Sequence, residues 1–93
     1  ATEVDYAWPA EYLLLSRQNL PLAQRLLDRQ LSIAPSESAW RVQMELFAYL
    51  GYRDRALDTA RRGLAYVQDG SLDEQNKAWS INYWREQITR LSQ

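Results

Sequence analysis

The sequence predicts an all-α domain of about five antiparallel helices, and three observations lead to this fold class. Apolar residues recur every three or four positions along most of the chain, which is the period of an α-helix. Most prolines and glycines stand at the edges of these periodic segments, where helices begin or end. No stretch alternates apolar and polar residues for long enough to indicate a strand. The length of 93 residues fits one domain.

The first two helices have recognisable ends. The first is expected from about residue 5 or 9 to 18, because proline is tolerated only near a helix start. The second is expected over 20–34, with Asn19 as its N-cap and Pro35 as its stop.

The other three helices are delimited in the same way. The third, 39–50, follows Ser36 and Ser38, which are both candidate caps, and is apolar on almost every side, as a helix buried between neighbours would be. The fourth is expected over 53–67 and the fifth over 72–92. Gly51 separates the third from the fourth, Gly70 closes the fourth, and Ser71 with Glu74 forms a capping box for the fifth.

Small residues form one stripe of the fourth helix. Ala56, Ala60 and Gly63 are spaced by four and three residues. A glycine inside a helix is unfavourable by roughly 0.5–1 kcal/mol relative to alanine. We therefore expect this stripe to let a neighbouring backbone approach closely.

The composition excludes several classes of protein. The chain has no cysteine and no histidine, so disulfide frameworks, thiolate or imidazole metal sites and enzymes that depend on these side chains are ruled out. The formal net charge of −1 lacks the basic surplus typical of nucleic-acid binding. The longest apolar runs have four residues, whereas a membrane-spanning helix needs about 20, so we expect no membrane insertion of this segment.

Two pairs of polar residues have the spacing of a catalytic or metal site. Asp54 and Asp58 lie one helical turn apart, but the arginines around them favour a solvated, ion-paired surface. Lys77 and Ser80 share a helix face, but the polar neighbours of Lys77 argue against the burial that would activate it. We expect no catalytic residue, no cofactor and no metal, and hence no enzyme.

The helical segments repeat. Segments 20–34 and 53–67 match at a shift of 33 residues, which places Ala23 on Ala56. A helix–turn–helix unit of this period resembles the tetratricopeptide repeat. The second copy carries the resemblance through Trp40, Phe47, Gly51, Ala56, Gly63 and Leu64; the first matches only at Ala23, Leu27 and Pro35. An unrelated five-helix bundle is the alternative fold.

The resemblance implies the organisation of the chain and a class of function. Residues 1–93 would form one domain, with a first hairpin at about 5–35, a second at about 36–68 and a capping helix at about 72–92, arranged as a right-handed superhelix. Such a domain would be a non-catalytic scaffold that binds a protein or peptide in a concave groove. Because the chain begins with Ala1 and not methionine, we expect a processed chain or a piece of a longer one.

The resemblance also implies which residues would line the groove. Carried over residue by residue, the family's groove positions fall on the first and third helices, at Asp5, Trp8, Tyr12, Leu15, Ser38, Arg41, Glu45 and Tyr49. Aromatic anchors beside a cation and an anion are typical of peptide recognition. The alternative is that Trp8 and Tyr12 complete the core of a small domain.

The fifth helix has two apolar sides. Ile81, Trp84, Ile88 and Leu91 form one seam, and at 100° per residue Leu72, Trp79 and Tyr83 point roughly away from it. The second side is expected to bind a partner, or a second copy of the chain as a homodimer. Alternatively, Trp79 and Tyr83 fold along the flank near Tyr66.

A second functional class rests on a looser resemblance. The opening segment YAWPAEYLLLSR, residues 6–17, followed by hairpin repeats, is similar to the periplasmic tails of bacterial polymerase-like or O-antigen-ligase-like membrane glycosyltransferases. The chain would then be a soluble periplasmic accessory domain of such an enzyme. Both resemblances leave the compartment open between the periplasm and the cytoplasm of a bacterium.

Overall fold

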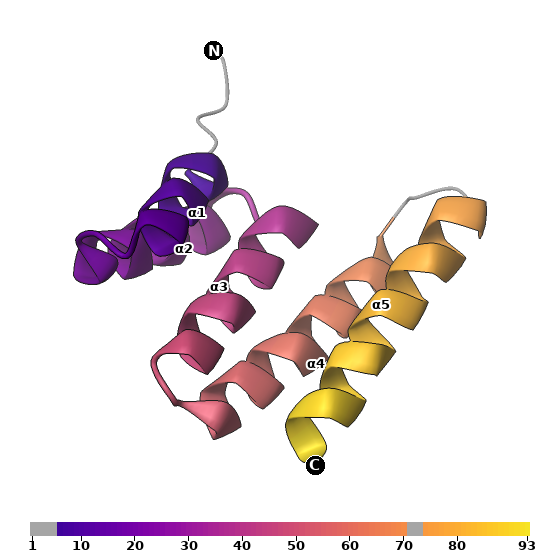
Figure 1. The fold of residues 1–93 in the computed structure, drawn as a ribbon. Helices are drawn as coiled ribbons and strands as arrows, with labels where there is room; N and C mark the ends of the chain where they lie inside the picture. The colour runs from indigo at the N-terminus through magenta and orange to yellow at the C-terminus, as the bar shows by residue number, and fades with distance from the viewer. Residues whose placement is uncertain (1–5, 71–73) are drawn as a thin grey trace.

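The computed structural model describes residues 6–70 and 74–93, and within them the chain is all-α, as predicted (Figure 1). Successive helices run antiparallel and each packs against the next; α1 also packs against α3. The helices are α1 (Ala7–Ser16), α2 (Leu20–Ile33), α3 (Glu37–Tyr49), α4 (Arg53–Asp69) and α5 (Glu74–Ser92).

The helices form two layers. The molecule measures 42 × 36 × 19 Å, and its thinnest dimension corresponds to about two helix diameters. In Figure 1, α1, α3 and α5 face the reader, whereas α2 and α4 lie behind them. Each layer therefore presents its own outer surface.

The helix ends confirm several signals read from the sequence. The Asn19 side chain accepts a hydrogen bond from the backbone N–H of Leu22, and Ser36 Oγ accepts one from the N–H of Ala39 at 3.1 Å. Because Ser36 is the cap, α3 begins two residues earlier than expected. Gly51 follows α3 with a φ of +85°, a conformation that glycine adopts without strain. The proposed capping box of Ser71 with the Glu74 side chain lies outside the described residues, as does Leu72.

Two apolar clusters make up the core, and α3 contributes to both. The first joins α1, α2 and α3 around Leu27 and Leu46. The second joins α3, α4 and α5 around Met44 and Trp84. The prediction that the third helix is buried on most sides is therefore confirmed.

The small-residue stripe of α4 receives the indole ring of Trp84. Ala56, Ala60 and Gly63 are all buried, and a Cβ built on Gly63 would lie 2.7 Å from ring atoms of Trp84. The expectation of tight packing is correct. However, the group that packs against the stripe is an aromatic ring and not the neighbouring backbone that the sequence led us to expect.

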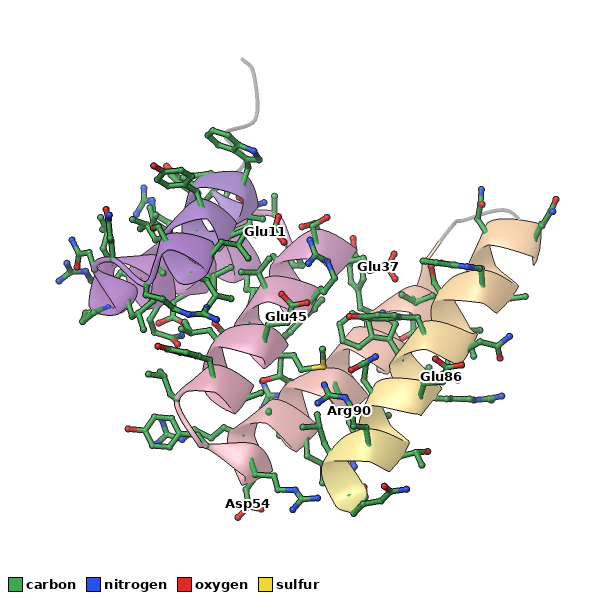
Figure 2. The ribbon with its side chains drawn as sticks, in the orientation of Figure 1. Glu11, Glu37, Glu45, Asp54, Glu86 and Arg90 are labelled. Carbon is green, nitrogen blue, oxygen red and sulfur yellow. The ribbon has the colours of Figure 1, made fainter. Side chains whose placement is uncertain are left out.

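One carboxylate holds the same tryptophan from the other side. Trp84 Nε1 donates a hydrogen bond to Glu37 Oε2 at 3.0 Å, and Ser80 Oγ donates to Glu37 Oε1 at 3.2 Å. Glu37 stands at the start of α3 and points between α3 and α5 (Figure 2). This contact links two helices that share no backbone packing in the described part of the chain.

Candidate partner-binding surface

Helix α1 leaves its largest side chains in solvent. Trp8 and Leu15 are each 71% exposed and Tyr12 is 59% exposed, and the two rings stack with centroids 6.5 Å apart. The core-facing side of α1 consists of Ala7, Ala10 and Leu14, which are all buried. The alternative that Trp8 and Tyr12 complete the core is therefore wrong.

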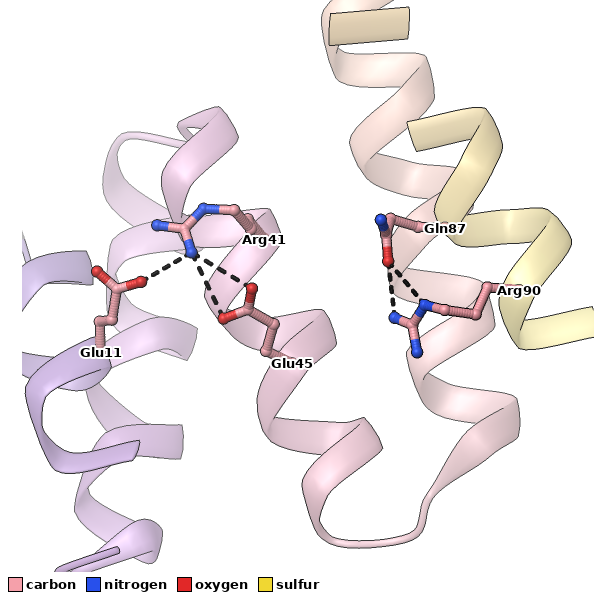
Figure 3. A network of polar contacts seen from close by, with 5 residues as sticks. All are labelled: Glu11, Arg41, Glu45, Gln87 and Arg90. Carbon is pink, nitrogen blue, oxygen red and sulfur yellow. Dashed lines mark hydrogen bonds and ion pairs between the residues drawn. The ribbon is translucent and has the colours of Figure 1, made fainter. Parts of the chain in front are cut away.

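Charged residues continue this surface from α1 onto α3. The Arg41 guanidinium contacts Glu11 Oε2 at 2.7 Å and Glu45 Oε1 at 3.4 Å, so it bridges the two helices (Figure 3). Its hydrogen bond to Glu11 raises the pKa of Arg41 above its ordinary value, despite the opposing effect of partial burial. Sequence analysis identified Arg41 and Glu45 but missed Glu11, which the family positions did not include.

At the far end of α3, an arginine from the α1–α2 connection covers a predicted groove residue. The guanidinium carbon of Arg17 lies 4.0 Å from the centroid of the Tyr49 ring, in cation–π geometry. Tyr49 remains 49% exposed. Nothing in the sequence pattern pointed to Arg17, because it lies in a connection where helical periodicity gives no information.

The two aromatic residues of α5 differ from each other. Trp79 is 71% exposed, as expected for a residue away from the seam, and stacks on Tyr83 at 6.3 Å. Tyr83, in contrast, is half-buried and packs edge-on against Trp84 at 5.2 Å. The prediction that Tyr83 points away from the seam is thus wrong. Tyr83 directly precedes Trp84, and 100° of rotation leaves a side chain this large in contact with its neighbour.

The surroundings of Tyr83 place it beside the charged residues of α3. Burial raises the pKa of the Tyr83 hydroxyl, and the charge of Glu45 raises it further, whereas Arg41 and Arg90 act in the opposite direction. Tyr83 therefore joins what the sequence predicted as two separate surfaces.

These exposed and charged side chains stand on the three helices of the front layer or, in the case of Arg17, directly after α1. Figure 2 shows Glu11, Glu45 and Arg90 on α1, α3 and α5, on the side that faces the reader. Arg90 is held by Gln87, whose Oε1 accepts hydrogen bonds at 2.7 and 3.1 Å (Figure 3). We call this the α1–α3–α5 surface. It comprises Trp8, Tyr12, Leu15, Arg41, Glu45, Tyr49, Trp79 and Tyr83, with Glu11, Arg17 and Arg90 among them.

One residue of each polar pair weighed as a catalytic site contacts another side chain. Asp58 pairs with Arg62 at 3.0 Å, and both side chains are exposed, as expected for a solvated ion pair. Ser80 is buried and donates to Glu37. Among the described residues, no three acidic side chains gather closely enough to hold a metal ion.

The opposite layer contains a feature that the sequence did not indicate. A cleft of about 750 Å³ lies between α2 and α4, with Trp40, Gln43 and Phe47 of α3 in its lining. It depends on how far apart α2 and α4 are held, and a single sequence read for periodicity does not give that separation.

Comparison with known proteins gave no match: no family model, no curated protein and no solved structure is similar to this chain. None of the helices that the structure describes combines the length and apolar character required to cross a bilayer.

Proposed function

We propose that this protein is a non-catalytic interaction module, built of tetratricopeptide-like hairpins, that binds a peptide or protein partner through the α1–α3–α5 surface. One observation carries the proposal: Trp8, Tyr12, Leu15, Tyr49 and Trp79 all stay substantially exposed in one layer of a small domain. Large apolar side chains gathered in solvent are typical of binding sites.

The arrangement of these residues supports recognition by rigid anchors. Stacking orders Trp8 on Tyr12 and Trp79 on Tyr83, so these rings lose little conformational freedom on binding. Tryptophan, tyrosine and arginine are also the residue types that most often dominate binding energy.

The charged groups suggest how a partner would be oriented. Arg41 is already neutralised by Glu11 and Glu45, whereas the Arg90 guanidinium donates hydrogen bonds to the neutral amide of Gln87. A partner carboxylate placed over the surface would therefore pair best with Arg90. Apolar side chains of the same segment would cover the aromatic residues.

Site-specific photocrosslinking tests the proposal. A benzophenone amino acid would replace Tyr12 or Trp79 on the surface, and Arg61 as a control that is exposed on α4. In cells that make the protein, positions 12 and 79 should give the same adduct, and position 61 should not.

A competition arm makes the test specific. Excess unlabelled protein should remove the adduct, whereas a competitor carrying Trp8→Ser and Leu15→Ser should not. Adducts of equal yield from all three positions, or from position 61 alone, would place the partner elsewhere and contradict the proposal.

A further inference from the structure

The layer formed by α2 and α4 has a cleft on its outer surface. Two adjoining hollows, of about 750 and 500 Å³, share Asp28, Gln43, Phe47 and Arg55 in their linings, so they form one continuous trough. Helix α3 forms its floor, and α2 and α4 form its walls. No backbone packing joins α2 to α4 among the described residues, which is why the trough stays open.

The floor of the trough is apolar and carries one unused hydrogen-bond donor. Trp40 and Phe47 line it from α3, and Leu31 from α2. The indole nitrogen of Trp40 is buried without an acceptor in the described part of the chain. Buried donors are normally paired, so this unpaired one is unusual, but the nitrogen is covered by protein atoms and its N–H serves here as a reporter on the floor.

The walls carry an excess of negative charge. Among the described residues, the hydrogen bonds that Asp28 accepts come from the neutral amides of Gln24, at 2.8 Å, and Gln43, at 3.4 Å. Asp54 has no ion pair or hydrogen bond within the described residues, and it stands at the end of the trough where α4 begins (Figure 2).

The cations of the trough are already occupied. Arg62 is paired with Asp58, and the Arg55 guanidinium lies over the rings of Phe47, at 5.9 Å, and Tyr52, at 5.3 Å. The carboxylates of Asp28 and Asp54 therefore flank an apolar floor, and neither forms an ion pair with a residue that the structure describes.

We propose that this trough is a second docking site, which binds a partner segment carrying an apolar side chain next to a basic one. The apolar side chain would lie on Trp40 and Phe47, and the arginine or lysine would pair with Asp28 and Asp54. The charge excess disfavours an acidic segment, and the apolar floor disfavours a free cation as the ligand. The site lies in the layer opposite the α1–α3–α5 surface, so both could be occupied together.

Short peptides test the charge and the apolar character separately. The probes are acetylated peptides with the central sequence Arg-Leu-Phe-Arg, the acidic counterpart Glu-Leu-Phe-Glu, and Arg-Gly-Ser-Arg, which lacks the apolar residues. Binding to the ¹⁵N-labelled 93-residue chain is followed by chemical-shift changes, with the Trp40 indole N–H as the reporter on the floor. Only the first peptide should shift this signal and the side-chain amide of Gln43.

Matched variants then locate the binding. The double variant Asp28→Asn with Asp54→Asn should weaken binding of the first peptide by roughly tenfold, because two partly exposed charge pairs are lost. The control variant Asp69→Asn changes an exposed aspartate at the C-terminal end of α4, the helix that carries Asp54. It should leave the affinity for the first peptide unchanged. Trp40→Phe should keep the fold and most of the affinity while removing the reporter.

Several outcomes would overturn the inference. They are equal binding of the acidic peptide, unchanged affinity in the double variant, no shift at millimolar peptide, or shifts confined to α1 and α5. The last outcome would remove the second site and leave the proposed function to the cross-linking experiment, so the two proposals fail separately.

Discussion

Two tryptophans of this chain stand on apolar helical stripes and have opposite environments. Trp84 of α5 is completely buried, whereas Trp8 of α1 is 71% exposed. The difference lies in the residues that face them, because Trp84 enters the space left by Gly63 and its indole nitrogen finds Glu37. Helical spacing alone therefore does not decide whether an aromatic residue is core, because the room that the facing helix leaves for the ring also matters.

The largest loss of stability is expected when the Trp84 ring is removed from the space beside Gly63. Trp84→Ala should lower the free energy of unfolding by about 3–5 kcal/mol, as for other large aromatic truncations in a core. Trp8→Ala makes the same chemical change on α1 and serves as the control. Urea denaturation measures both, and similar losses in the two variants would remove the contrast.

The second-largest loss of stability is expected when a larger side chain on α4 fills the space that Trp84 occupies. Gly63→Leu should cost roughly 1–3 kcal/mol by overpacking against Trp84, and Ala56→Leu should behave similarly. Ala65→Leu, on an exposed side of the same helix, is the matched control and should change stability by less than about 0.5 kcal/mol. An unchanged urea midpoint for Gly63→Leu would mean that α5 does not pack there.

A smaller effect should separate the two stacked aromatics of α5. Tyr83→Ser removes a half-buried ring that contacts Trp84, so about 1–2 kcal/mol should be lost, below the value for a fully buried side chain. Trp79→Ser should leave the melting temperature nearly unchanged and should reduce any concentration-dependent self-association. Analytical ultracentrifugation measures the association, and equal destabilisation by both changes would show that Trp79 is also core.

The smallest effect on stability is expected on α1, where the effect on binding should be greatest. Trp8→Ser with Tyr12→Ser should change the free energy of unfolding by less than about 0.5 kcal/mol, because both rings lie in solvent. Circular dichroism and urea denaturation test this directly. If the double variant unfolds, these rings support the domain and the partner must be sought on α5 or in the cleft.

The sequence was sufficient to predict features set within one helix or at its ends. Asn19 and Ser36 could be read as caps, Gly51 as the residue after a helix, and Trp84 as part of the α5 seam, because each depends on local spacing. The all-α class follows from the same local signals.

Features that depend on how helices lie against one another could not be predicted in this way. The bridge from Arg41 to Glu11 spans two helices, and the cleft exists because α2 and α4 are held apart. Tyr83 was misplaced for a related reason, since ideal helical angles ignore the reach of a large side chain toward its neighbour.

The contact of Glu37 with α5 has a consequence for the width of the α1–α3–α5 surface. In the described residues the backbones of α3 and α5 do not pack together, so their separation is set by α4, by the side chains that the two helices share in the second core cluster, and by the Glu37 carboxylate at the start of α3. Under the proposed function, the width of the segment that fits between α3 and α5 would therefore depend in part on Glu37, which is held by Ser80 and Trp84 and lies outside the residues proposed to contact the partner.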